Sequence, residues 1–214
     1  MPEGLPIGPW VFTASFGLVL LLAEVRGWIW LRRLAKPLAS VGFLWAGYAA
    51  GALDGSGVGA ALSVALLLSF VGDVLLLATS KRGLLLGLIA FALAHVAFIA
   101  AFVIRGVELG WLVPAAVILG VVGALVWRWL SPHVGSMRGP VLGYVVIVSA
   151  MFAGGVASHG HAANWALLLG TGCFYLSDLF VARHRFVAPG FTNKIFGQPL
   201  YYLGQLLIAS FVLS

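Results

Sequence analysis

Two aspartates lie inside stretches of the sequence that are otherwise apolar enough to cross a membrane. Asp73 occurs in LLLSFVGDVLLL (66–77), and Asp178 occurs in CFYLSDLFVARHRF (173–186). A carboxylate in hydrocarbon is costly unless it is paired, hydrogen-bonded or protonated, so such residues usually face the bundle interior and mark function. Two carboxyl groups in surroundings of different polarity can divide the roles of general acid and general base.

The two aspartates are predicted to lie at similar depths. Asp73 is eight residues before Lys81, and Asp178 is five residues before Arg183. At the rise of an α-helix these spacings put the carboxylates about 12 Å and about 7 Å inside the same membrane boundary. The structural alternatives are a hydrogen bond from Asp73 to a neighbouring helix, and a helix-end anchor or arginine pair for Asp178.

Other polar residues are predicted at or near this half of the bilayer, on several different segments. They are Lys36, His95, Tyr144, Ser177, Tyr201 and Gln205. His95 is predicted close to the midplane, where a neutral histidine that shares one hydrogen bond is the simpler explanation. Tyr201 and Gln205 continue a polar stripe that packing between helices also explains. Convergence at one depth favours a polar pocket that is reached from the cytoplasmic leaflet.

The composition indicates the elements that position these residues. Of the 214 residues 62% are hydrophobic and 8% are charged, which is typical of an integral membrane protein. We predict an all-α polytopic fold, a bundle of eight transmembrane helices in a single domain, 1–214. The predicted spans are 10–24, 36–53, 59–79, 83–104, 111–130, 139–157, 162–182 and 197–213.

The basic residues predict the orientation of the chain. Eleven of the twelve Lys and Arg residues lie in or beside the odd-numbered connections, and only Arg105 belongs to an even-numbered one. By the positive-inside rule the odd connections are cytoplasmic and both termini lie outside. The short connections favour a bacterial inner membrane, with the pocket toward the cytoplasmic leaflet.

Several other function classes find no support in the sequence. The net charge of +6 resides in short connections and does not indicate a nucleic-acid partner. A single cysteine, Cys173, excludes an intramolecular disulfide. The DGSGVGA stretch (54–60) lacks the strand and lysine of a phosphate loop and predicts a turn. The HGH at 159–161 is a weak metal signal, so we predict neither a metal nor another cofactor.

Six short motifs occur in an order that resembles the YhhN-like lysoplasmalogenase family, from about residue 30 to the C-terminus. The motifs are KPL (36–38), SFVGDVLLL (69–77), GLIAFALAHVAFI (87–99), GYVVIVSAM (143–151), FYLSDLFVARHRF (174–186) and YYLGQLLI (201–208). The resemblance implies a membrane hydrolase that cleaves the vinyl ether bond of lysoplasmalogens. Its products are a fatty aldehyde and a glycerophospho-alcohol such as glycerophosphoethanolamine or glycerophosphocholine.

The resemblance also implies site residues. The aspartate of the family maps to Asp73, its serine–aspartate pair to Ser177 and Asp178, its histidine to His95 and its lysine to Lys36. Vinyl ether hydrolysis needs an acid that protonates carbon, and then an anion that stabilises an oxocarbenium ion, as in glycosidases.

We expect Asp73 to be the acid, because it lies deeper and burial favours its protonated form. Asp178 then stabilises the cation and activates water. Lys36 is expected to attract the substrate phosphate. The residues expected to orient glycerol or water are Tyr144, Tyr201 and Gln205.

Two alternatives remain at this point. Intramembrane aspartate and histidine also build proton relays, so a proton-coupled transporter of small molecules or lipids competes with the enzyme. A non-catalytic lipid-binding membrane protein is the third possibility. The expected partner is a lysophospholipid in the membrane, while the sequence leaves the headgroup and the oligomeric state open.

Overall fold

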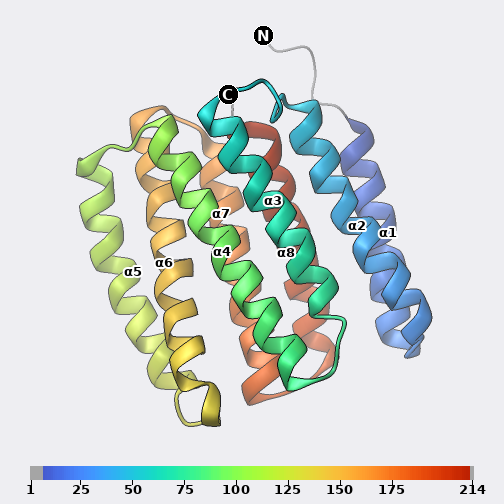
Figure 1. Cartoon of the computed structure of the whole chain (residues 1–214). Coiled ribbons are helices and arrows are strands. Elements are labelled where there is room, and N and C mark those ends of the chain that lie inside the picture. The colour runs from blue at the N-terminus through green and yellow to red at the C-terminus, as the bar shows by residue number, and fades with distance from the viewer. Residues whose placement is uncertain (1–6, 213–214) are drawn as a thin grey trace.

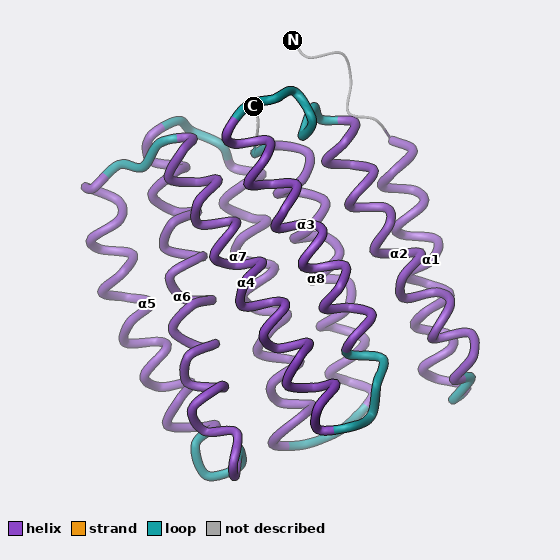
Figure 2. The backbone as a smooth tube through the Cα atoms, in the orientation of Figure 1, coloured by secondary structure: helices purple, strands orange, loops and turns teal. Residues whose placement is uncertain are grey.

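The computed structural model describes residues 7–212, and these form a bundle of helices without a strand (Figures 1 and 2). The helices are α1 (Ile7–Arg26), α2 (Ile29–Ala49), α3 (Gly57–Leu75), α4 (Lys81–Arg105), α5 (Leu109–Leu130), α6 (Arg138–His161), α7 (Trp165–Ala182) and α8 (Phe191–Phe211). A short 3-10 helix, η1 (Gly135–Met137), precedes α6, and a π-helical turn, η2 (Arg183–Val187), follows α7. The predicted all-α fold is thereby confirmed.

Six of these helices are long and apolar enough to cross a membrane, namely α1, α3, α4, α5, α6 with η1, and α7 with η2. The other two, α2 and α8, are long enough but more polar. Basic residues such as Arg32 and Lys36 interrupt α2, and amides such as Gln198 and Gln205 interrupt α8. Both helices pack against each other and against other helices of the bundle, where polar side chains can find partners away from lipid.

The helices pack as sequential antiparallel pairs: α1 with α2, α3 with α4, α5 with α6, and α7 with α8. Contacts of α8 with α1 and α2, and of α6 with α4 and α7, join the pairs into one bundle. The first residues of α1 and the last residues of α8 lie at the same end (Figure 1). The connections with the basic residues lie at the opposite end, which we call the basic end.

The boundaries differ from the predicted ones by four residues or more in five places, two of which are the end of α2 at Ala49 instead of residue 53 and the start of α8 at Phe191 instead of residue 197. Helix α2 begins at Ile29 instead of residue 36, because Pro37 is accommodated inside the helix. Helix α3 ends at Leu75, so residues 76–79 belong to the connection. Helix α6 continues to His161, which makes the HGH stretch helical. The predicted end of the last span, residue 213, lies outside the described residues.

Two glycines let α7 and α8 approach closely. A Cβ placed on Gly204 would lie 2.8 Å from the carbonyl oxygen of Gly170 and 2.9 Å from the backbone nitrogen of Phe174. Small residues allow such backbone contact in membrane bundles. The contact brings the Phe174 ring of α7 to a centroid distance of 5.4 Å from the Tyr201 ring of α8. It therefore fixes the two helices on which Asp178 and Tyr201 reside.

Candidate active site

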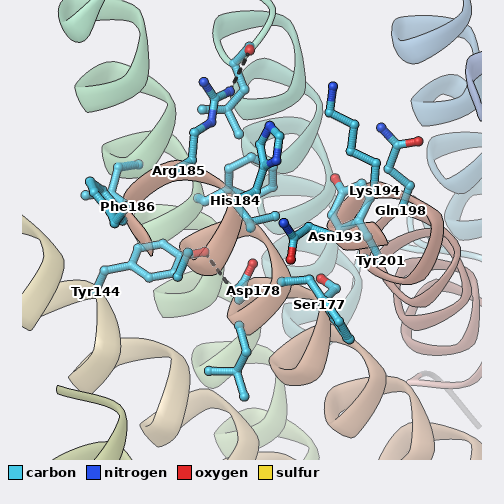
Figure 3. A pocket seen from close by; sticks show the side chains of 18 of the residues that line it. Tyr144, Ser177, Asp178, His184, Arg185, Phe186, Asn193, Lys194, Gln198 and Tyr201 are labelled. Atoms are coloured by element: carbon cyan, nitrogen blue, oxygen red, sulfur yellow. Dashed lines mark hydrogen bonds between the residues drawn. The ribbon is translucent and has the colours of Figure 1, made fainter. Parts of the chain in front are cut away.

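A cavity of about 210 Å³ lies toward the basic end of the bundle and is lined by both intramembrane aspartates. Side chains from all eight α-helices line it, and η2 adds several more. Figure 3 shows part of this lining, with Tyr144 and Asp178 labelled. The residues that line the cavity form three regions. These are an acidic region with two clusters, a cationic end and an apolar wall. The acidic clusters centre on Asp73 and on Asp178.

Asp73 is 2% exposed and accepts contacts from two other helices. The Lys36 Nζ of α2 lies 3.0 Å from its Oδ1. The hydroxyls of Ser40, also on α2, and of Tyr201 on α8 each donate to its Oδ2 at 2.6 Å. Short bonds from hydroxyl groups and a lysine ammonium are typical of an ionised carboxylate. Asp73 is thus a fully partnered anion that ties α2, α3 and α8 together.

Gln205 contacts Asp73 only indirectly, through the Tyr201 hydroxyl. Its Nε2 lies 3.3 Å from the Tyr201 hydroxyl oxygen, to which it donates. Gln205 is fully buried and does not itself line the cavity. Its amide therefore holds the Tyr201 hydroxyl in the orientation that donates to Asp73.

Asp178 has a different environment, with fewer charged partners and more access to the cavity. Its side chain is 14% exposed, and the Tyr144 hydroxyl of α6 donates to its Oδ2 at 2.9 Å (Figure 3). The Nε2 of His95 on α4 lies 3.6 Å from the same oxygen. Asp178 therefore sits between one hydroxyl donor and one imidazole.

The other ring nitrogen of His95 determines what its Nε2 offers. The Nδ1 lies 2.6 Å from the carbonyl oxygen of Phe91, which can only accept, so Nδ1 carries a hydrogen. In the neutral ring Nε2 then presents a lone pair to Asp178. The ring is fully buried, with the Phe174 ring centroid 4.7 Å away. This arrangement suits a protonated Asp178, which could donate to the imidazole.

Ser177 also lines the cavity, from the residue before Asp178. Its side chain is buried, and its Oγ has no hydrogen-bond partner among the described residues. Six of the eight predicted site residues thus line the cavity. The other two, His95 and Gln205, contact residues that line it.

The cationic end consists of Arg32 on α2, Arg185 on η2 and Lys194 on α8. In Figure 3 Arg185 and Lys194 lie on the same side of the cavity, with Asp178 and Tyr144 on the other. One carboxylate, Glu24 of α1, also lies there, and the Nζ of Lys194 is 2.7 Å from its Oε2. From the sequence, Arg32, Arg185 and Lys194 were expected only to orient the chain in the membrane, and not to belong to the site. The signal for Arg32 was its position one helical turn before Lys36.

The apolar wall is formed by branched side chains from three helices. They are Leu84 and Leu88 of α4, Val126 and Leu130 of α5, and Val141 and Val145 of α6. The same residues belong to a hydrophobic cluster that is separate from the main core of the bundle. The cavity is therefore amphipathic, with carboxylates between a cationic end and an aliphatic surface.

Comparison with known proteins gives a consistent set of relatives. A model of the YhhN family matches residues 31–212. The human lysoplasmalogenase TMEM86B is 33% identical over 182 residues, covering 84% of this chain and 74% of that protein. The pig lysoplasmalogenase TMEM86B is 31% identical over 209 residues, covering 95% and 84%. The bovine lysoplasmalogenase TMEM86A is 29% identical, covering 68% of this chain and 62% of that protein. No solved structure matches the chain.

Proposed function

The chain belongs to the YhhN family, and from this membership and the geometry of the cavity we propose that it is a membrane lysoplasmalogenase. It hydrolyses the vinyl ether bond of an alkenyl-glycerophosphoethanolamine or alkenyl-glycerophosphocholine. The products are a fatty aldehyde and the glycerophospho-alcohol. The relatives carry this name, and the sequence motifs and the site agree with it.

The observation that carries the proposal is the position of two differently partnered carboxyl groups on one amphipathic cavity. Asp73 is compensated by a lysine and two hydroxyls, while Asp178 faces a tyrosine hydroxyl and an imidazole. Surroundings that differ in this way separate the roles of two carboxyl groups. A vinyl ether needs this division, because the step that protonates its carbon also creates a positive charge, so one group must give a proton while another stays anionic.

We assign Asp178 as the general acid and Asp73 as the anion, which reverses the expectation drawn from depth alone. The Lys36 ammonium lies 3.0 Å from Asp73 and two hydroxyls donate to the same carboxyl group, so Asp73 has the partners of an anion. Within residues 7–212 the one basic group within ion-pairing distance of Asp178 is His95, whose Nε2 offers a lone pair. Asp178 is also the more exposed of the two, so its proton can reach a substrate.

The reaction then balances in three steps. Asp178 transfers its proton to the alkene carbon remote from oxygen, which leaves an oxocarbenium ion beside the Asp73 carboxylate. Water adds to the cationic carbon and gives a proton to the Asp178 carboxylate, forming a hemiacetal and restoring the acid. The hemiacetal carbon–oxygen bond breaks, and the glycerol oxygen takes the proton from the hemiacetal hydroxyl. One water is consumed, and the acid is restored.

The remaining residues position these two carboxyl groups. Tyr144 of α6 and His95 of α4 both contact the same oxygen of Asp178. Tyr201, supported by Gln205, fixes Asp73. The unpartnered hydroxyl of Ser177 is free to contact the glycerol or the water. We place Lys36 with Asp73 instead of with the substrate phosphate, because its ammonium is already engaged.

The apolar wall is proposed to hold the alkenyl chain. Its leucines and valines reach the cavity from α4, α5 and α6, so an aliphatic chain lying there would exclude water from the alkene carbon. By the positive-inside rule, we propose that this end of the bundle lies in the cytoplasmic leaflet. A bacterial inner membrane remains our proposed location.

The test is an aldehyde assay on the purified protein in detergent with an alkenyl-glycerophospholipid. We expect the wild type to release aldehyde, and Asp178→Asn and Asp73→Asn each to lower kcat by at least about 10²-fold. Thermal unfolding checks that each variant is folded. A folded wild type that releases no aldehyde, but moves the lipid or protons across liposomes, would overturn the enzyme in favour of the transporter.

A further inference from the structure

Arg32 at the cationic end carries a guanidinium without a counter-ion. It lines the cavity from the first turn of α2, and its Nε is buried without a hydrogen-bond partner. Within residues 7–212 the ion pairs of lysine and arginine with carboxylates are Lys36 with Asp73 and Lys194 with Glu24, and neither includes Arg32. A buried N–H of a charged group that makes no hydrogen bond is costly. This cost indicates that a ligand accepts a hydrogen bond from it.

Arg185 lies next to Arg32 and increases this need for an anion. One nitrogen of its guanidinium donates to the carbonyl of Leu76 at 3.1 Å. The two guanidinium charges are close enough to repel each other, and Glu24 attracts Arg185. Because Glu24 is also held by Lys194 at 2.7 Å, one carboxylate faces three cations at this end. An excess of positive charge in a partly enclosed site favours binding of an anion.

We propose that Arg32 and Arg185 bind the phosphate group of the substrate, an inference that rests on the proposed function. Planar guanidinium groups recognise phosphate oxygens through two parallel hydrogen bonds, which a lysine cannot do. Arg32 precedes Lys36 by four residues, so it lies about 6 Å along the α2 axis from the lysine that holds Asp73. The three-carbon glycerol unit spans the gap between a vinyl ether at Asp73 and a phosphate at Arg32.

The test compares Arg32→Gln with a matched control, Arg33→Gln. Arg33 is the next residue of α2, it is exposed, and it does not line the cavity, so its substitution makes the same change in net charge. Each protein is assayed with an alkenyl-glycerophosphoethanolamine and with the corresponding 1-O-alkenyl-glycerol, which has no phosphate. The second substrate retains the reacting bond and the chain.

We expect Arg32→Gln to raise KM for the phosphate-bearing substrate about ten- to hundred-fold, with a smaller change in kcat. The same variant should leave kcat/KM for the alkenyl-glycerol unchanged, and Arg32→Lys should fall between the wild type and Arg32→Gln. Equal losses on both substrates, or an equal effect of Arg33→Gln, would overturn the proposal.

A binding measurement separates this proposal from the proposed function. A 1-O-alkyl lysophospholipid, whose saturated ether is not hydrolysed by this chemistry, is titrated calorimetrically against wild type and Arg32→Gln, and the 1-O-alkyl-glycerol serves as control. Weaker binding of the phospholipid alone supports the phosphate site even if no aldehyde is formed. Inorganic phosphate is titrated in parallel: weak binding assigns the site to the lipid, while binding as tight as that of the phospholipid assigns it to the free anion. Equal binding of the phospholipid by both proteins refutes the site.

Discussion

At the scale of single residues, the ion pair between Lys36 and Asp73 is the feature on which the site depends. The lysine is 17% exposed and the aspartate 2%, so the attraction acts in a medium of low polarity. The desolvation of both charges opposes it, and for this reason the pair itself contributes little to net stability. Loss of one partner is different, because the other charge is left buried.

We therefore expect Lys36→Met to lower the free energy of unfolding by about 3 kcal/mol. The double variant Lys36→Met with Asp73→Asn should recover most of this loss, because no buried charge remains, yet it should release no aldehyde. Thermal or denaturant unfolding in detergent and the aldehyde assay measure the two effects. A double variant as unstable as the single one would contradict a direct ion pair between these residues.

At the scale of elements, the site depends on the close packing of α7 against α8. Asp178 is on α7 and Tyr201 on α8, and the backbone contact of Gly170 with Gly204 sets their separation. Substitution of Gly204 must move the two helices apart, because the atoms nearest to its added Cβ are backbone atoms of α7. Glycines that face open space lack this role. Gly120 on α5 is one of them: no heavy atom lies within 4 Å of its added Cβ.

Gly204→Ala is expected to destabilise the protein by about 1–3 kcal/mol through overpacking, and to reduce aldehyde release because Tyr201 shifts away from Asp73. The matched control, Gly120→Ala, should be neutral or stabilising by up to about 1 kcal/mol, since alanine favours the helix. Unfolding curves and activities of the two variants decide the matter. Equal stability of both would show that α7 and α8 do not pack as closely as described.

At the scale of the whole molecule, charge and cavity are on the same end of the bundle. Eleven of the twelve Lys and Arg residues lie in or beside the connections there, opposite the first residues of α1 and the last residues of α8. Residues of η2 and of the first turn of α8 line the cavity, so it lies close to the same connections. The membrane orientation that the charges predict would thus also determine the leaflet from which substrate enters.

Cysteine labelling tests this orientation. In a Cys173→Ala background, Leu53→Cys marks the connection between α2 and α3, and His133→Cys marks the connection between α5 and α6; both positions are exposed. In intact cells a membrane-impermeant maleimide should label only the first, and permeabilisation should be required for the second. The opposite pattern would place the cavity in the outer leaflet.

The sequence alone determined the properties that depend on local composition. Helices were predictable because an apolar segment in lipid must satisfy its own backbone, and their number followed from the alternation of apolar and basic stretches. The depths of Asp73 and Asp178 followed from their distances to Lys81 and Arg183. The same reasoning placed the start of α2 too late, because Pro37 was read as a boundary.

Only the tertiary structure decided how the polar residues are partnered. Lys36 and Asp73 are far apart in the sequence, and their contact depends on how α2 and α3 are rotated and packed. That packing assigns Lys36 to Asp73, leaves Arg32 without a counter-ion, and turns the lone pair of His95 toward Asp178. Depth is a property of one helix, whereas the charge state of a buried carboxyl group is set by the side chains that other helices bring to it.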